Sequence, residues 1–505
     1  MEAAGPSAKK KRSDELEADE SPPPAIAAME APNPQPAAKK KRSSHIQESA
    51  PPPGAGEGGG AGEADRISGL PDAILGEIIS LLPTKDGART QVLASRWRHL
   101  WRAAPLNLDS VGFPAEDDDA YARAVSRILS THRGPGRRFR VAAHLIHSRP
   151  DTVDAWLRSP ALDNLQEIDF YHRSMDPYQL RPSPSPPPAS ISRFSGSLRV
   201  ATFSKCRIPD SLAETLCFPE LKQLGIEKVR ISEGAFQSLI SSCPALECLF
   251  VNESFGFSCL RINSNSLRSI GVRAQRCWRD EPRFDELIIE DAPCLEKLLY
   301  ADRFGIRLSV VAAPKLTTFG CPSDTHRDLR ILFGATEFQG LNTVSLMTVM
   351  RSVKILAVHL WIFDLDKVID LMKCFPCLEK LYMMGGCNST KANFWRRKHR
   401  LLLKSLDIHL KTVVLECYRG INGLVRFASF FLMNARELEV LRLVVGTEDY
   451  NEQFFAEQHM MLEMEKRASR GARLDFTTHT CYVGGLLPIK HVCELSITDP
   501  FQCRC

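Results

Sequence analysis

Residues 65–109 read DRISGLPDAILGEIISLLPTKDGARTQVLASRWRHLWRAAPLNLD, and this stretch decides how the chain begins to fold. Pro71 suits the first turn of a helix, where its missing N–H leaves no hydrogen bond unmade. Large apolar residues then recur at three- and four-residue intervals from Ile74 to Leu82, the periodicity of one helical face, and Pro83 ends the run. The sequence therefore predicts a short amphipathic helix here.

Two further helices are predicted in the same stretch. Thr84 is placed to cap a second helix that carries Val92 and Leu93. Trp97 and Trp101 stand one turn apart in a third. A unit of about forty residues rarely buries so many large apolar side chains by itself. We therefore expect part of its apolar surface to dock on another protein, although a simple three-helix cap of the following domain is an alternative.

This stretch resembles an F-box, the module that docks on the small adaptor subunit of cullin-based ubiquitin ligases. The resemblance rests on Leu70-Pro71, on the face of Ile74, Leu75 and Ile78, and on Ser95-x-Trp97 followed by Leu100-Trp101. It implies apolar residues shared between the module's own core and a groove of the adaptor. The adaptor-binding residues that it implies are Leu70, Pro71, Ile74, Leu75, Ile78, Leu82, Leu93 and Trp97. Gly87 departs from the family pattern and is expected to weaken the second helix by about 1 kcal/mol relative to Ala.

Composition excludes several classes of protein. The chain has 505 residues, 44% of them hydrophobic and 25% charged, which is ordinary for a soluble protein of two or three domains. Its net charge of +5 is too small to point to nucleic-acid binding. The sequence has neither a run of about eighteen apolar residues nor the apolar stretch of a secretory signal, so we expect no membrane association. Sixteen cysteines then indicate a reducing compartment, the nucleus or the cytoplasm.

The first 64 residues are rich in Pro, Ala, Gly and Ser and are predicted to form a disordered tail. Two basic clusters interrupt this tail: Lys9, Lys10, Lys11 and Arg12, and then Lys39, Lys40, Lys41 and Arg42. Clusters of this kind are typical of nuclear-import signals. Solubilising charge and contact with nucleic acid are the less favoured interpretations.

From about residue 160 the pattern L-x-x-L-x-L recurs, which is the signature of leucine-rich repeats. Copies begin at Leu165, Leu198, Leu221, Leu246, Leu267, Leu295, Leu316, Leu341, Val353, Leu378, Leu403 and Leu438. Each repeat can bury its apolar face only against its neighbours. We therefore expect an α/β fold in which an irregular solenoid of parallel strands forms an arc with a concave surface. A generic α/β protein with leucine-rich strands is the alternative.

The outward positions of the repeat are candidate contacts for a target protein. Because side chains alternate along a strand, the fourth and sixth positions face the core and the third and fifth point outward. Exposed aromatic and arginine side chains on a concave face are common recognition anchors. The candidates are Phe250, Lys297, Leu299, Lys380, Tyr382 and Arg442. A register error of one residue would place all of them in the core.

The segment at about 400–445 resembles the C-terminal FBD region of plant F-box proteins with leucine-rich repeats. Its pattern predicts a strand at 413–415, a helix with Leu424, Phe427 and Phe431 on one face, and a strand from Leu438 to Val444. Residues 491–497 are predicted to form a last strand that caps the array. The expected organisation is a tail at 1–64, an F-box at 65–109, leucine-rich repeats at 110–400 and an FBD-like region at 401–505. This combination implies a plant source.

No catalytic, cofactor or metal site is expected. The sequence lacks nucleophile-elbow, zinc-protease and P-loop motifs. Cys374 and Cys377 have metal-like spacing, but both fall at turns of the repeat, which favours packing. The pairs His479-x-Cys481, His491-x-Cys493 and Cys503-x-Cys505 are also expected to bind no metal, since structural zinc normally has tighter cysteine pairs.

These patterns predict a non-catalytic, substrate-recognition subunit of an SCF-type cullin ubiquitin ligase. The F-box-like stretch would hold the adaptor, and the repeat arc would hold an unidentified target protein for ubiquitination. Ubiquitin transfer would be catalysed by other subunits, and this chain would contribute proximity. The alternatives are a nuclear interaction scaffold that binds the adaptor or other proteins without delivering substrates, and a nucleic-acid-associated regulator that uses the basic tail.

Overall fold

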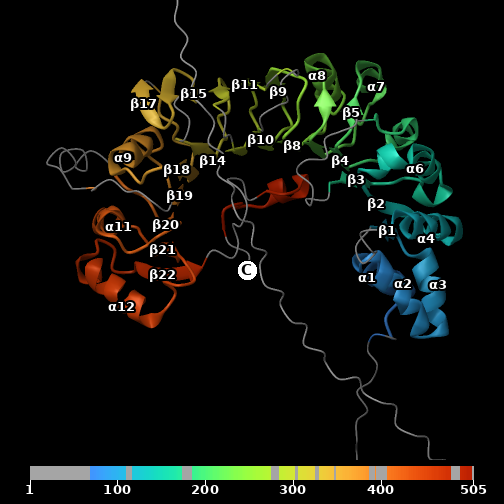
Figure 1. Cartoon of the computed structure of the whole chain (residues 1–505), viewed down its shortest axis with the longest axis horizontal. Helices are drawn as coiled ribbons and strands as arrows, with labels where there is room; N and C mark the ends of the chain where they lie inside the picture. Colours follow the sequence, from blue (N-terminus) through green and yellow to red (C-terminus); the bar gives the residue numbers. More distant parts are fainter. Residues whose placement is uncertain are drawn as a thin grey trace, which may run out of the picture. The chain divides into compact units, whose positions relative to one another are not determined.

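The computed structural model describes residues 67, 69–109, 117–172, 185–274, 282, 284–301, 305–324, 329–345, 348–385, 393, 407–478 and 489–502. All of these belong to one unit, Asp65–Cys505 (Figure 1). The predicted disordered tail and its two basic clusters lie outside the described residues, as do the cysteine pairs at 479–481 and 503–505.

A curved sheet of fourteen strands runs through this unit, and every neighbouring pair of strands is parallel (Figure 1). In spatial order the strands are β1 (Leu106–Leu108), β2 (Gly136–Ala142), β3 (Glu167–Tyr171), β4 (Val200–Ser204), β6 (Gln223–Glu227), β8 (Cys248–Asn252), β10 (Ser269–Arg273), β12 (Lys297–Ala301), β14 (Thr318–Ser323), β18 (Ile355–Leu360), β19 (Lys380–Gly385), β20 (Thr412–Leu415), β21 (Val440–Val445) and β22 (Arg473–Thr478). The sheet therefore joins the F-box-like stretch, the repeats and the FBD-like stretch in one continuous array.

Helices and a second sheet cover the outer side of this array (Figure 1). The helices are α4 (Asp118–Thr131), α5 (Leu145–Ser148), α6 (Pro150–Leu157), α7 (Asp210–Thr215), α8 (Glu233–Ser241), α9 (Leu365–Cys374), α11 (Asn422–Asn434) and α12 (Glu452–Met461), with short 3-10 turns η2 (Pro160–Leu162), η3 (Ala189–Phe194) and η4 (Met464–Lys466). The six-stranded outer sheet has the order β17 (Asn342–Ser345), β16 (Thr336–Gln339), β15 (Arg330–Phe333), β13 (Arg307–Val310), β11 (Glu286–Asp291) and β9 (Cys259–Asn263). A short pair, β5 (Arg207–Ile208) and β7 (Arg230–Ile231), completes the strands.

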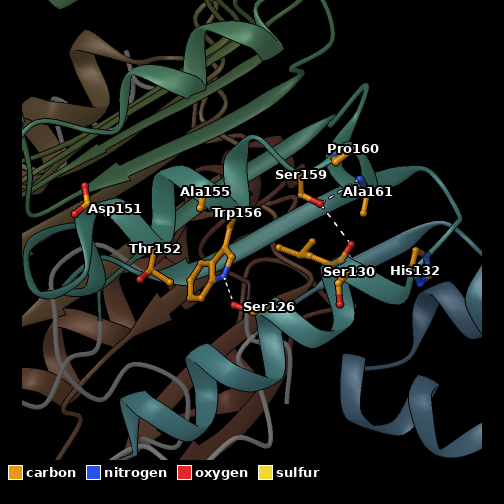
Figure 2. Close-up of a pocket in the computed structure, with 11 residues that line it drawn as sticks. Ser126, Ser130, His132, Asp151, Thr152, Ala155, Trp156, Ser159, Pro160 and Ala161 are labelled. Carbon is orange, nitrogen blue, oxygen red and sulfur yellow. Dashed lines mark hydrogen bonds between the residues drawn. The ribbon is translucent and has the colours of Figure 1, made fainter.

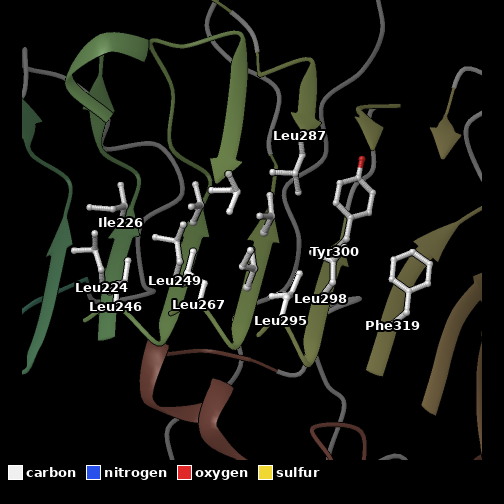
Figure 3. Close-up of a cluster of buried hydrophobic side chains, with 14 of the residues drawn as sticks. Leu224, Ile226, Leu246, Leu249, Leu267, Leu287, Leu295, Leu298, Tyr300 and Phe319 are labelled. Carbon is white, nitrogen blue, oxygen red and sulfur yellow. The ribbon is translucent and has the colours of Figure 1, made fainter. Parts of the chain in front are cut away.

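The repeat leucines form the core between these layers. Leu224, Leu249 and Leu298 are fully buried there, and Figure 3 shows equivalent side chains of successive strands in one stack. The predicted solenoid of parallel strands is confirmed, and so is the burial of the fourth and sixth positions in the described copies other than the one at Leu341. The alternation of side chains along each strand produces this result.

Two predicted copies of the repeat, at Leu341 and Leu403, are not found as strands of the fourteen-stranded sheet among the described residues. The copy at Leu341 is wrong, because Leu341 leads into β17 of the outer sheet. Gly334 and Gly340, both with positive φ, turn the chain back on either side of β16, so this stretch forms antiparallel hairpins. The copy at Leu403 lies outside the described residues, and β20 follows Leu410 instead.

The FBD-like stretch folds as the sequence predicts. Strand β20, helix α11 and strand β21 follow one another, and Leu424, Phe427 and Phe431 of α11 are buried. Parallel strands require a crossover connection, and the helix provides it here.

The F-box-like stretch forms α1 (Asp72–Leu81), α2 (Thr84–Arg89), the 3-10 turn η1 (Thr90–Val92) and α3 (Ser95–Ala103). The expected three-helix arrangement is confirmed, but Thr84 does not cap α2. Pro83 occupies the position before the helix. The Thr84 hydroxyl donates to the Asn107 carbonyl at 2.8 Å and accepts from the Asp109 N–H at 2.8 Å. Thr84 therefore ties the helices to the first strand of the sheet.

The packing around Gly87 argues against the expectation that this glycine weakens the module. A Cβ at this position would lie 2.8 Å from Cζ3 of Trp101, so the packing of α2 on α3 requires glycine. We predict that Gly87→Ala lowers the free energy of unfolding by about 1–3 kcal/mol, as overpacking does, despite alanine's higher helix propensity. Urea denaturation measures the change.

Gly76 in α1 is the matched control for this prediction. A Cβ there would meet the Ala104 Cβ at an ordinary 3.8 Å. Gly76→Ala is therefore expected to stabilise the protein by up to about 1 kcal/mol. Equal stabilisation by both substitutions would contradict the packing constraint at Gly87.

Candidate protein-interaction sites

Exposed apolar side chains gather on residues 67–93. Fifteen large hydrophobic side chains are exposed among the described residues, and almost half of them lie in this short stretch. They are Ile67, Ile74, Ile78, Leu81, Leu82, Val92 and Leu93, and together we call them the docking face. Leu81 is 77% exposed and Val92 is 84% exposed. Such a concentration of exposed apolar side chains is typical of sites that bind another protein, so the docking face is a candidate interaction site.

The structure separates the predicted adaptor contacts into accessible and buried residues. Pro71, Ile74, Ile78, Leu82 and Leu93 are exposed, and Leu70 is partly exposed. Leu75 and Trp97 are 0% and 9% exposed and belong to the core, so their expected availability to an adaptor is wrong. Helical geometry explains the difference, since Leu75 lies about 100° around the helix from Ile74.

Sequence reasoning missed three residues of the docking face, Ile67, Leu81 and Val92. The signal for Leu81 is present in the sequence, because Ile74, Ile78 and Leu81 follow the spacing of one helical face. The start of α1 is held in place by Arg96, whose Nε donates to Asp72 Oδ1 at 2.7 Å and whose Nη2 donates to the Leu70 carbonyl at 2.7 Å. These bonds fix Leu70 and Pro71 beside the docking face.

The second candidate site is the face of the fourteen-stranded sheet opposite the leucine core, which we call the inner face. The third and fifth positions of the repeat point here, as predicted, and form a separate apolar cluster. Their expected exposure is wrong for four residues. Phe250 and Leu299 are 0% exposed, Tyr382 is 7% exposed and Lys297 is 8% exposed.

Residues 489–502, which we call the terminal segment, cover these side chains. The segment lies on the inner face, and its 3-10 turn η5 (Val492–Ser496) contacts strands β6, β8 and β10 (Figure 1). The predicted final strand at 491–497 is therefore wrong. The spacing of Ile489, Val492 and Leu495 at three-residue intervals, typical of a 3-10 turn, is the signal that the strand prediction overlooked.

Three predicted target contacts bind the terminal segment through polar groups. The Lys297 ammonium donates to the carbonyls of Leu495 at 3.3 Å and Ile497 at 2.7 Å, and burial lowers its pKa. The Lys380 ammonium and the Tyr382 hydroxyl both donate to one oxygen of Asp499, at 2.7 and 2.9 Å. The sixth candidate, Arg442, donates to Asp475 at 2.7 Å with 31% of its side chain exposed.

At the start of the terminal segment, His491 lies beside two acidic residues, Asp169 and Glu227. Its Nε2 lies 3.5 Å from Asp169 Oδ2 and 3.1 Å from the Thr202 hydroxyl. Burial opposes a charge on this ring, but its bonds to Asp169 and Cys493 raise the pKa of His491 to about 10. Burial also raises the pKa of the neighbouring Glu227 to about 7. The His491 Nε2 lies within ion-pairing distance of Asp169, and its Nδ1 accepts from the Cys493 N–H at 3.3 Å.

Burial at Glu416, which directly follows β20, raises its pKa from 4.5 to about 7. The native protein therefore retains a proton that the unfolded chain releases above pH 4.5, and this stabilisation is lost as the pH rises through 7. We predict that Glu416→Gln reduces the fall in unfolding free energy between pH 5 and pH 8 by on the order of 2 kcal/mol. Urea denaturation at the two pH values measures it.

The control for this pH effect is Glu220→Gln, since Glu220 is exposed. This variant should show the wild-type dependence of stability on pH. An unchanged dependence in Glu416→Gln would contradict the assignment of the effect to Glu416.

A hollow of about 680 Å³ lies between α4 and α6 (Figure 2). Two of the polar groups that line it make hydrogen bonds within the protein. Trp156 Nε1 donates to the Ser126 hydroxyl at 2.8 Å, and His132 Nε2 bonds the Ala104 carbonyl at 2.9 Å. Burial lowers the pKa of His132. We assign no ligand to this hollow.

Other candidate chemistry gains no support. Cys374 is buried, which agrees with its interpretation as a packing residue, and burial raises its pKa to about 11. Within the described ranges, no group of three potential metal ligands is found. No helix in the same ranges has the length and apolar character needed to span a bilayer.

The fold is that of a leucine-rich-repeat protein whose N-terminal helices expose a group of apolar side chains. A family model described as "FBD-associated F-box protein At5g56370, LRR repeats" matches residues 153–383, and the model "FBD" matches residues 400–443. FBD-associated F-box protein At5g56370 of Arabidopsis thaliana is 34% identical over 418 residues, which cover 74% of this chain and 89% of that relative. The chain therefore belongs to the plant F-box proteins that carry leucine-rich repeats and an FBD region.

Other Arabidopsis thaliana relatives match over shorter stretches. FBD-associated F-box protein At4g10400 is 29% identical over 242 residues, 47% of this chain and 56% of the relative. F-box/LRR-repeat protein 13 is 28% identical over 255 residues, 48% of this chain and 53% of the relative. The chain thus spans about half the length of these two curated relatives.

Proposed function

We propose that this chain is the substrate-recognition subunit of an SCF-type cullin ubiquitin ligase. The observation that carries the proposal is the docking face, which exposes seven large apolar side chains, four of which the F-box resemblance implies as adaptor contacts. The repeat array would then hold the target protein. The chain would contribute no catalytic group, but it would raise the effective concentration of the target at the ligase.

We propose localisation in the nucleus, the cytoplasm or both, with nuclear import directed by the clusters at 9–12 and 39–42. The alternative of a nuclear scaffold shares the adaptor contact but delivers no substrate for ubiquitination. The two functions therefore differ in whether cullin and ubiquitinated proteins are bound together with the adaptor.

Purification of the tagged full-length chain from plant cells distinguishes them. The proposal predicts that adaptor, cullin and ubiquitinated proteins co-purify, and that proteasome inhibition increases the ubiquitinated fraction. The Ile74→Asp/Leu93→Asp variant should lose all three. Adaptor without cullin or ubiquitinated proteins would support the scaffold instead.

A further inference from the structure

We infer that the inner face is a polypeptide-binding groove and that the terminal segment is an intrachain ligand that a target segment of similar chemistry replaces. This inference rests on the proposed function, because it identifies the class of target that the array would hold. The target segment would carry apolar anchors three residues apart, followed by a carboxylate and an aromatic side chain. Three observations on the inner face support it.

The first observation is the shape of the sheet beneath the segment. One row of inner-face positions crosses neighbouring strands as Phe250, Gly271, Leu299, Gly320 and Ala357. Large and small residues alternate along this row as far as Gly320, and a third small residue, Ala357, follows. A glycine inside a strand is unfavourable unless another group approaches closely. The small residues of this row therefore leave gaps between the larger side chains.

Side chains of the terminal segment fill these gaps. A Cβ at Gly320 would lie 2.4 Å from Cζ of Phe501, and a Cβ at Gly271 would lie 3.0 Å from Cδ2 of Leu495. Leu495 and Phe501 are 0% and 2% exposed. The ring of Phe501 also lies 5.4 Å from that of Tyr382. The inner face thus has fitted positions for two apolar anchors of a crossing polypeptide.

The second observation is the division of polar contacts. Lys297 binds two backbone carbonyls of the segment, which any polypeptide provides. Lys380 and Tyr382 bind the Asp499 carboxylate, a group that a polypeptide provides only through an acidic side chain or its C-terminus. Asp499 itself is 7% exposed, so its charge is compensated within the groove. The groove therefore binds a polypeptide backbone in general and a carboxylate in particular.

The third observation concerns how the segment is attached. The terminal segment contributes no strand to any of the sheets that the described residues form. It is held by side-chain packing, by the Lys297 bonds and by ion pairs, with no backbone ladder to the array. Another chain with the same anchors can make each of these contacts. The covalent link gives the segment a high effective concentration, so it lowers the apparent affinity for a target.

Exchange of the segment tests this inference. A site-specific protease sequence is inserted between Val483 and Gly484 of the full chain, which is purified, cleaved after folding and dialysed. The probe is a fluorescent peptide of residues 489–502, IKHVCELSITDPFQ. We expect saturable binding to the cleaved protein, and at least tenfold weaker binding to the uncleaved protein. Peptides with Asp499→Asn or Phe501→Ala should bind at least tenfold more weakly, whereas Lys490→Ala, at an exposed position, should bind like the wild-type peptide.

A full-chain variant provides the second measurement and does not depend on cleavage. Asp499→Ala/Phe501→Ala weakens the intrachain ligand, so the uncleaved variant should bind the wild-type peptide at least tenfold more tightly than the wild-type chain. Folded protein that binds no peptide in either form would overturn the inference, because the segment would then be a permanent part of the core. Adaptor titration of the same preparations separates the two claims: intact adaptor binding without peptide binding overturns only the groove, and lost adaptor binding overturns the proposed function.

Discussion

The Ile74→Asp/Leu93→Asp variant should bind the adaptor at least a hundredfold more weakly than the wild-type chain. Ile74 and Leu93 are 49% and 64% exposed, so both are available to a partner and neither supports the core. Burying such a side chain contributes about 1.5–3 kcal/mol, and two losses correspond to about two to four orders of magnitude in affinity. A buried unpaired carboxylate adds a further penalty. Calorimetric titration with the purified adaptor measures the change.

Val311→Asp is the matched control for this loss. Val311 is 64% exposed, like Leu93, but it follows β13 in the outer sheet, outside the docking face. This variant should bind the adaptor with wild-type affinity, and all three proteins should unfold within about 0.5 kcal/mol of one another. Wild-type adaptor binding by Ile74→Asp/Leu93→Asp would show that the adaptor binds elsewhere.

Phe250→Ala should lower the free energy of unfolding by about 3–5 kcal/mol, the range for large-to-small substitutions in a core. Phe250 is 0% exposed because the terminal segment covers it. Trp361 is 61% exposed, and Trp361→Ala should change stability by no more than about 0.5 kcal/mol. Urea denaturation of the full-length variants measures both. A small loss for Phe250→Ala would mean that the segment does not cover the inner face.

A double-mutant cycle assigns this loss to the terminal segment. Phe250 and Leu495 belong to the inner-face cluster, so Phe250→Ala and Leu495→Ala should show a coupling energy of about 0.5–3 kcal/mol. Leu249 is equally buried but lies in the leucine core on the other side of the sheet. Leu249→Ala should be as destabilising as Phe250→Ala, yet additive with Leu495→Ala. Equal coupling in both cycles would contradict the separation of the two faces.

Local patterns predicted much of this fold because the forces behind them are local. The two-residue alternation correctly placed Leu249 and Val251 in the leucine core and Phe250 on the opposite face of the sheet. The L-x-x-L-x-L spacing likewise predicted the parallel strands that stack along the array. Helical spacing predicted α1 and most of its exposed apolar face.

Exposure was not predictable in the same way. Whether Phe250 faces solvent depends on Leu495 and its neighbours, which lie more than two hundred residues away in the sequence and carry no repeat signal. The constraint at Gly87 is also tertiary, since it arises from the ring of Trp101 on another helix. Sequence periodicity specifies the direction of a side chain, whereas contacts between distant segments specify what covers it.

The most direct test of the central claim is a calorimetric titration of the wild-type full-length chain with the adaptor at several temperatures. The account predicts one-to-one binding with a Kd of about 1 μM or lower, and a negative heat-capacity change from the burial of the docking face. Leu70→Ala/Pro71→Ala should weaken this binding at least tenfold while the chain remains folded. A folded wild-type chain that gives no binding heat at any of these temperatures, and no adaptor complex on gel filtration, would contradict the account.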